Sequence, residues 1–280
     1  MKIETNVSLS SLTTFKMGGN VKKLYIPECE DELIDLLAEI PSPHYIIGGG
    51  SNLLINDKKE FDAVISLGSF DKRIELQKDG SYYVGASVRL QKLIKEINEN
   101  GYGGIEYLFS VPGFVGGAIV MNAGRGNSTD EIGKRVIKVK AIVNGEVCEI
   151  SRADCKFTRR SSIFKNSDML VLGGYFQFEK GEPSFFKELC KQRISYVKET
   201  QDNSLPNFGT VFYKSNYKLM KVIRFFSKRK SDKVFFSNKT TNWMLNNGGT
   251  FEEAIRKIEQ VKKLHRLIRK PCETEVIIWE

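Results

Sequence analysis

Two glycine-rich segments contain the residues whose type and spacing are best suited to ligand chemistry. The first, residues 46–55 (IIGGGSNLLI), places three glycines directly after a short apolar run. Glycine tolerates positive φ and lets another group approach the main chain, and exposed amide N–H groups in such a turn can bind an anion. The common phosphate loops do not fit, because no Gly-Lys-Ser/Thr follows and Leu53 occupies the last glycine position of G-x-G-x-x-G. A phosphate-binding turn and a plain tight turn between two strands are both open interpretations.

The second segment, residues 110–126 (SVPGFVGGAIVMNAGRG), is rich in glycine yet too apolar to be a disordered linker. Two glycine-rich, apolar loops that are far apart in sequence can converge on one extended ligand that carries phosphate groups. A dinucleotide cofactor has this shape, so the two segments together favour such a ligand over two isolated turns.

The composition is that of an ordinary globular protein. Of 280 residues, 41% are hydrophobic and 28% are charged, and no apolar run approaches the roughly 20 residues needed to span a membrane. The N-terminal residues lack the apolar core of a signal peptide, so a cytoplasmic location is expected. Five scattered cysteines without a C-x-x-C pair, and only two histidines, His44 and His265, indicate reduced thiols and no metal site.

The net charge of +9 suits an anionic partner, whether nucleic acid, a membrane surface or a phosphorylated small molecule. A solvated basic surface is an equally open alternative. The basic residues are concentrated at residues 227–233 (SKRKSDK) and 262–270 (KKLHRLIRK), so we expect an anionic substrate to meet the last third of the chain. No RNA- or DNA-binding motif interleaves aromatic residues with these runs, which argues against nucleic acid.

The hydrophobic pattern predicts an α+β fold in three packed parts, which we expect to be domains over residues 1–70, 71–180 and 181–280. The first contains a helix and short buried strands around the glycine loop, and the second is mainly antiparallel sheet with one helix. The dipeptide Asn144-Gly145 between alternating apolar residues predicts a β-hairpin. The predicted helices cover residues 27–40, 90–101, 185–197 and 250–268, and the predicted strands cover 44–47, 63–67, 82–88, 136–143, 146–150, 169–178, 209–214 and 273–279.

The last of these helices has the clearest start signal. Thr250 and Glu253 have the spacing of a capping box. Its apolar face is expected to lie in the core and to consist of Ala254, Ile258, Val261, Leu264 and Ile268.

A series of motifs, taken in order, resembles the UDP-N-acetylenolpyruvoylglucosamine reductases, the flavoenzymes of bacterial peptidoglycan synthesis. The matching segments are TTFKMGG from residue 13, GGGSNLLI, GGIEYLFSVPGFVGGAIVMNAG, FTRRSSIFK, PNFGTVF, TNWMLN and ETEV. Because the series covers nearly the whole chain, it is much more specific than any one motif. The resemblance implies a two-lobed FAD-binding domain of the vanillyl-alcohol oxidase type and a C-terminal α+β substrate domain, in the shorter of the family's two types.

By this resemblance, the two glycine segments contact FAD, chiefly at its pyrophosphate and isoalloxazine ring, through backbone amides instead of a P-loop lysine. The first segment carries Ser51 and no histidine, so bound FAD is expected to be non-covalent. The residues implied in the first segment are Ile47, Gly48, Gly49, Gly50, Ser51, Asn52 and Leu53. Those implied in the second segment are Ser110, Val111, Pro112, Gly113, Gly116, Gly117, Asn122, Ala123 and Gly124.

The resemblance also implies the reaction and its catalytic residues. NADPH is the reductant, and the substrate is UDP-N-acetylglucosamine enolpyruvate, which takes up hydride at its double bond and a proton at the neighbouring carbon. Arg160 aligns with the family's arginine and Glu275 with its glutamate, which together stabilise the enolate-like charge. Thr210 stands where the family usually has a serine as proton donor. Lys198 and Asn242 are predicted to bind the nucleotide sugar. Lys198, Lys218 and the basic run at residues 227–230 are candidates to meet its diphosphate in place of the family's segment, and solvated lysines are the equally open alternative.

Three departures from the family pattern leave the substrate open. Arg159 replaces a tyrosine, Thr210 replaces the serine, and residues 227–242 lack the family's glycine-rich segment and histidine. A divergent paralogue that acts on another nucleotide sugar is therefore one alternative, and a flavin-free basic binding module is another. For the flavoenzyme, we expect a cytoplasmic monomer that binds neither nucleic acid nor membrane.

Overall fold

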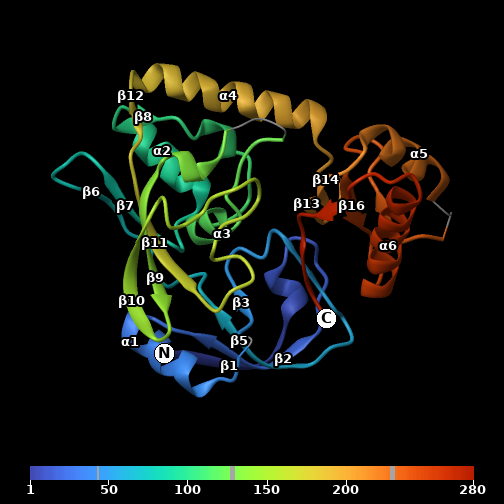
Figure 1. Ribbon diagram of the computed structural model, residues 1–280, viewed down its shortest axis with the longest axis horizontal. Coiled ribbons are helices and arrows are strands. Elements are labelled where there is room, and N and C mark those ends of the chain that lie inside the picture. The colour runs from blue at the N-terminus through green and yellow to red at the C-terminus, as the bar shows by residue number, and fades with distance from the viewer. Residues whose placement is uncertain (43, 127–129, 228–230) are drawn as a thin grey trace. The chain divides into compact units, whose positions relative to one another are not determined.

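The computed structural model describes residues 1–42, 44–126, 130–227 and 231–280 (Figure 1). Its α-helices are α1 (Glu30–Glu39), α2 (Leu90–Glu99), α3 (Val115–Val120), α4 (Pro183–Thr200), α5 (Tyr217–Ser227) and α6 (Phe251–Leu267). Its strands are β1 (Lys2–Ser8), β2 (Asn20–Ile26), β3 (Ile46–Ile47), β4 (Leu53–Ile55), β5 (Phe61–Ser66), β6 (Ile74–Leu76), β7 (Tyr82–Gly85), β8 (Tyr102–Gly103), β9 (Val136–Val143), β10 (Glu146–Ser151), β11 (Leu170–Phe176), β12 (Glu179–Lys180), β13 (Asn207–Thr210), β14 (Phe212–Lys214), β15 (Val234–Phe236), β16 (Trp243–Asn246), β17 (Glu273–Thr274) and β18 (Ile277–Trp279).

The chain folds into two compact units. Unit 1 comprises Met1–Thr5, Lys23–Gly49 and Ala63–Val197, and unit 2 comprises Asn6–Lys22, Gly50–Asp62 and Lys198–Glu280. The first glycine segment is therefore divided between the two units after Gly49. The division into domains at residues 70 and 180 stays a prediction. Across the described residues, no helix combines the length and the apolar character needed to cross a bilayer.

Unit 1 contains the antiparallel sheet β10-β9-β11-β7-β6, in which β9, β10 and β11 lie side by side (Figure 1). Asn144 and Gly145 join β9 to β10 with φ values of 51° and 83°, and two positive values are what a type I′ turn requires. The predicted hairpin and antiparallel sheet are therefore confirmed. The sequence predicted only a glycine-rich loop where the short helix α3 forms, and Ile119 of α3 lies against Gly174 of β11.

Helix α2 follows its sequence pattern closely. Leu90, Leu93, Ile94 and Ile97 have the i, i+3, i+4, i+7 spacing of one helix face, and each is exposed by 1% or less. Burial of one such side chain stabilises a fold by about 1.5–3 kcal/mol relative to leaving it in water. Gly101, with a φ of 76°, turns the chain after the helix, as predicted.

The sheet β1-β2-β5-β3 contains two strands that the sequence did not predict. Most residues of β1 and β2 are exposed or half-buried, so neither strand shows the clear alternation of apolar and polar residues that identifies strands in a sequence. The strands predicted at residues 44–47 and 63–67 are present as β3 and β5, which pair in parallel. Helix α1 begins at Glu30, three residues later than predicted, with an acidic first turn that complements the helix dipole.

Helix α6 in unit 2 begins with the predicted capping box. Thr250 Oγ1 accepts a hydrogen bond from the Glu253 N–H at 3.3 Å, and the Glu253 carboxylate accepts one from the Thr250 N–H at 3.4 Å. The predicted apolar face is wrong at its C-terminal end, where Leu264 and Ile268 are 38% and 48% exposed.

The buried stripe of α6 continues instead through His265, which is fully buried. His265 lies four residues after Val261 and seven after Ile258, which places it on the buried stripe. Leu264 is one residue earlier and therefore lies about 100° around the helix from His265. The His265 ring accepts a hydrogen bond at Nε2 from the Asn216 N–H and donates one from Nδ1 to the Val261 carbonyl, both at 2.9 Å. A polar ring is stable in this position because both of its nitrogens are satisfied.

Candidate active site

The two glycine-rich segments meet inside unit 1. A Cβ atom added to Gly49 would lie 3.2 Å from the Cα atom of Gly113, and one added to Gly48 would lie 3.5 Å from the Phe114 ring. The amide N–H groups of Gly48 and Gly49 donate to no group in the described part of the chain. The predicted convergence of the two segments is therefore present at these residues, and it leaves main-chain donors that suit an anion.

The second segment is held in place by the loop that follows β7. The Gly116 N–H donates to the Ala86 carbonyl and the Val115 N–H to the Val88 carbonyl, both at 2.9 Å. A Cβ atom on Gly116 would lie 2.9 Å from the Cβ atom of Ala86, so glycine is required there by packing. Gly117 differs, because it is exposed and a Cβ atom on it would meet nothing within 4 Å. This open side of the loop is where a ligand can approach the backbone.

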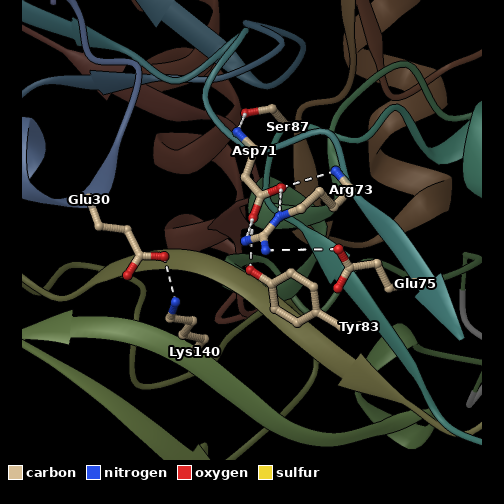
Figure 2. A network of polar contacts seen from close by, with 7 residues as sticks. All are labelled: Glu30, Asp71, Arg73, Glu75, Tyr83, Ser87 and Lys140. Carbon is tan, nitrogen blue, oxygen red and sulfur yellow. Dashed lines mark hydrogen bonds and ion pairs between the residues drawn. The ribbon is translucent and has the colours of Figure 1, made fainter. Parts of the chain in front are cut away.

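A network of polar contacts around Asp71 fixes the loop after β7 (Figure 2). The Asp71 carboxylate accepts hydrogen bonds from Arg73 Nη2 at 2.7 Å, Arg73 Nε at 3.1 Å and the Tyr83 hydroxyl at 2.8 Å. The main chains of Asp71 and Ser87 are joined by a 2.9 Å hydrogen bond. A Cβ atom on Gly85 would lie 2.4 Å from the Asp71 carboxyl carbon, so the acid packs directly on the strand end.

This arrangement determines the ionisation of the acid. Burial alone would raise the pKa of Asp71, but the hydrogen bonds from Arg73 and Tyr83 outweigh it and hold that pKa below its usual value. Asp71 is therefore a charged residue at neutral pH that supports the loop on which Gly116 rests. The sequence does not distinguish Asp71 from a surface carboxylate. Its one signal for the ion pair is that Arg73 follows two residues later.

Arg160 lies against the end of the second segment, also in unit 1. It is 7% exposed and its Nη2 atom donates to the Gly124 carbonyl at 2.7 Å. A Cβ atom on Gly124 would lie 2.8 Å from Arg160 Nη1, so this glycine makes room for the guanidinium group. Asn122 uses its side chain for support, because its amide donates to Glu131 and to the Thr158 carbonyl, both at 2.8 Å.

Unit 2 brings the other two candidate catalytic residues together. Thr210 is the last residue of β13, and Glu275 lies in the gap between β17 and β18. The Glu275 N–H donates to the Val211 carbonyl at 2.8 Å, and the Asn52 amide donates to the Glu275 carbonyl at 3.1 Å. These hydrogen bonds place Glu275 beside the residue that follows Thr210 and beside the end of the first glycine segment. Arg160 belongs to unit 1.

Two further glycines near the candidate site have a positive φ, a backbone conformation that glycine adopts readily. Gly50 has a φ of 59°, and a Cβ atom on it would lie 1.9 Å from the Leu12 carbonyl oxygen. This glycine therefore lets the segment around Leu12 pack onto the first glycine loop. Gly209, next to Thr210, has a φ of 78° and nothing within 4 Å of its Cβ position, so the backbone beside Thr210 is open to a ligand.

The comparisons with known proteins identify the family. The FAD binding domain family matches residues 21–151. UDP-N-acetylenolpyruvoylglucosamine reductase of Thermotoga maritima is 30% identical over 97% of this chain and 96% of its own length. The chain belongs to the UDP-N-acetylenolpyruvoylglucosamine reductase family. The reductase of Chlamydia felis is 28% identical over 92% of this chain and 88% of that protein.

A solved structure gives the same fold. UDP-N-acetylenolpyruvylglucosamine reductase from Thermus caldophilus superposes with a TM-score of 0.84 over 100% of both chains, at 23% sequence identity. The predicted fold class is therefore confirmed. The resemblance to the reductase family is confirmed by the 30% identity to the Thermotoga maritima reductase.

Within this family framework, the two residues implied to bind substrate have contacts of their own. The Asn242 side chain donates to the Phe212 carbonyl at 2.7 Å and accepts from the Phe212 N–H at 3.1 Å, so it holds β14 in place. Lys198 is exposed, and its carbonyl accepts a hydrogen bond from Lys239 Nζ at 2.6 Å. Substrate binding by Lys198 and Asn242 stays a prediction, and residues 228–230 of the basic run lie outside the described residues.

Proposed function

We propose that the chain catalyses the reduction of UDP-N-acetylglucosamine enolpyruvate to UDP-N-acetylmuramate by NADPH, with non-covalently bound FAD. The observation that carries this proposal is the 30% identity to a UDP-N-acetylenolpyruvoylglucosamine reductase over nearly the whole of both chains. In the overall step, NADPH gives up a hydride and becomes NADP⁺, and the carbon–carbon double bond gains that hydride and one proton. FAD, when bound, relays the hydride between the two nucleotides.

Residues of both glycine segments fit the cofactor. The N–H groups of Gly48 and Gly49, which donate to none of the described residues, lie where the segments meet, and backbone donors of this kind bind a pyrophosphate without a lysine. The open face of Gly117 gives a planar ring room to approach the main chain. The proposed contacts also include the other residues of both segments, among them Ser51 and Ser110.

The proposed role of Arg160 is to bind the substrate carboxylate and to stabilise the negative charge that develops on it. Its near-complete burial supports this role, because a charge held in a poorly solvated site interacts more strongly with a developing anion. The hydrogen bond to Gly124 fixes the guanidinium group before substrate arrives. Glu275 is proposed to share a proton with the same enolate oxygen, and Thr210 to deliver the proton to carbon.

We also propose that the enzyme works as a monomer in the cytoplasm. All five cysteines are free thiols, which suits a reducing compartment. Sedimentation equilibrium of the flavin-loaded protein tests the oligomeric state. Limited proteolysis tests the three-domain division, which predicts cleavage near residues 70 and 180.

The function is tested with purified protein under anaerobic conditions. We expect a yellow protein whose flavin absorbance is bleached by NADPH and restored by UDP-N-acetylglucosamine enolpyruvate, with UDP-N-acetylmuramate as product. Flavin that is bleached by NADPH but never restored by this substrate would favour a paralogue with another nucleotide sugar, for which Arg159 and Thr210 are the sequence motivation. A colourless protein that binds no FAD on reconstitution would leave only the basic binding module.

A further inference from the structure

Helix α4 and the end of the second glycine segment place two arginines on one tyrosine ring in unit 1. Arg193 Cζ lies 5.4 Å from the centroid of the Tyr196 ring, and Arg125 Cζ lies 5.3 Å from the same centroid. Arg193 Nε also donates a 2.9 Å hydrogen bond to Ser110 Oγ. Two guanidinium groups, one aromatic ring and one hydroxyl group therefore form a cluster, which we call the arginine cluster.

The charges in this cluster are not balanced at Arg193. Burial and then the positive charge of Arg125 lower the pKa of Arg193, and no carboxylate contributes to that shift. Among the described residues, the Arg193 side chain hydrogen-bonds only Ser110 Oγ, through Nε, so both terminal nitrogens of its guanidinium group have donors to offer. A partly desolvated cation beside a like charge is unfavourable unless an anion joins it.

The chemistry of the cluster selects the kind of anion. A guanidinium group presents planar paired donors that match the oxygen atoms of a phosphate group, and these charge-assisted bonds are strong. Tyr196 is 46% exposed, which leaves the ring and the arginines on it accessible to a ligand. A phosphate group therefore satisfies the terminal donors of Arg193 and pairs with its positive charge.

The position of the cluster links it to the active site. Ser110 is the first residue of the second glycine segment, and Arg125 directly follows Gly124, whose carbonyl accepts the hydrogen bond from Arg160. Both residues that anchor the cluster are therefore continuous with the segment proposed to face the flavin and the reacting carbons.

We propose that Arg193 and Arg125 bind a phosphate group of one of the two nucleotides that react at this site. The proposal rests on the proposed function, since it takes NADPH and a nucleotide sugar as the nucleotides. The phosphate belongs either to NADPH, which carries a 2′-phosphate that NADH lacks, or to the diphosphate of the nucleotide sugar. Loss of FAD from the variants would instead assign the cluster to the flavin, since Ser110 is also one of the proposed FAD contacts.

The test compares Arg193→Gln, Arg125→Gln and Arg193→Lys with the parent, all loaded with FAD. Lys187→Gln is the matched control, because it removes one positive charge from the exposed side of the same helix. Stopped-flow measurements give the apparent dissociation constant and the limiting rate for flavin reduction by NADPH and by NADH. The same instrument gives both constants for reoxidation by the enolpyruvyl nucleotide sugar.

We expect the glutamine variants to weaken the binding of one nucleotide about tenfold or more, with the limiting rates and flavin content unchanged. Arg193→Lys should recover part of the loss, because it restores charge without paired donors. A loss with NADPH but not with NADH assigns the site to the 2′-phosphate, and a loss only with the sugar substrate assigns it to the diphosphate.

Calorimetric titration of the flavin-loaded proteins with adenosine 2′,5′-bisphosphate and with UDP provides a readout that does not require turnover. Binding of either probe that is weakened in Arg193→Gln but not in Lys187→Gln supports the inference even if the parent fails to reduce the enolpyruvyl sugar, a result that would remove only the proposed function. The inference is overturned if both probes bind the parent and Arg193→Gln equally, if neither binds the parent, or if the glutamine variants lose FAD instead.

Discussion

The Nη2 atom of Arg160 donates a 2.7 Å hydrogen bond to the carbonyl oxygen of Gly124. Arg160 has a φ of 57°, a left-handed conformation that costs a non-glycine residue of order 1 kcal/mol or more and persists only where the surroundings enforce it. The glycine leaves space for the guanidinium group, so the cation and the second glycine segment determine each other's position. The proposed catalytic charge is therefore fixed by the same segment that is proposed to contact the flavin.

This coupling predicts which half of the reaction depends on Arg160. Arg160→Met should leave flavin reduction by NADPH nearly intact and slow reoxidation by the enolpyruvyl sugar about a hundredfold or more, because one stabilising partner of the enolate is lost. Glu275→Gln should act on the same half-reaction. Stopped-flow absorbance of the flavin separates the two steps. Equal rates in both steps for Arg160→Met and the parent would remove Arg160 from the mechanism.

The fold could be predicted where several local signals agree. The Asn144-Gly145 turn and the Thr250 capping box each combine a specific residue pair with a matching hydrophobic pattern, and both are present. The strand predicted at residues 209–214 is instead split into β13 and β14, which pair with different strands. The break falls at Val211, whose N–H donates to the Asn242 carbonyl and whose carbonyl accepts from the Glu275 N–H, and an apolar run does not reveal such distant partners.

The candidate site was only partly predictable for a similar reason. A glycine indicates a position where a side chain is not tolerated, but the sequence does not say whether protein packing or a ligand excludes it. Gly116 and Gly124 make room for neighbouring protein groups, whereas Gly117 faces open space. Asp71 and Arg193 were missed altogether, because a charged residue looks the same in a sequence whether it ends on the surface or half-buried beside a loop.

The meeting point of the glycine segments predicts a graded effect of side-chain size at Gly49. Gly49→Ala places a Cβ atom 3.2 Å from Gly113, a contact that a small shift can relieve. Gly49→Val adds two methyl groups at this point, so it should separate the segments and yield largely colourless protein. Flavin content per chain after reconstitution measures the effect, with circular dichroism as the control for folding. Full flavin content in Gly49→Val would show that the cofactor lies elsewhere.

The Asp71 network predicts a stability change that depends on pH. Its folded pKa is depressed, so its contribution to stability is fully present above the unfolded pKa of about 3.9 and is lost as pH falls through the folded pKa. Asp71→Asn should therefore lower the free energy of unfolding at pH 7 by about 1.5–3 kcal/mol, and the difference from the parent should shrink in acid.

Urea denaturation of the flavin-loaded proteins at several pH values measures this difference. Asp62→Asn is the matched control, because the Asp62 side chain is 88% exposed and a solvent-exposed pair such as the one with Lys22 contributes little to stability. A deficit in Asp71→Asn that stays constant from neutral to acid pH would contradict the charged network.

Thr210 ends β13 beside the open backbone of Gly209, and the next residue, Val211, accepts the Glu275 N–H. If its hydroxyl group delivers the proton to carbon, Thr210→Ala should slow reoxidation of the flavin by roughly a hundredfold, within the range for general acid catalysis. Thr210→Ser keeps the hydroxyl and removes a methyl group that restricts χ1, so it should retain or raise the parental rate. Thr210→Val is the control for shape, because it keeps the branched side chain without the hydroxyl. Stopped-flow measurement of flavin reoxidation should give similar rates for Thr210→Ser and the parent, and similarly slow rates for Thr210→Val and Thr210→Ala. If Thr210→Val reoxidises the flavin as fast as the parent, the Thr210 hydroxyl is not the proton donor and Thr210 is a packing residue. The proton would then come from another residue of unit 2 or from solvent.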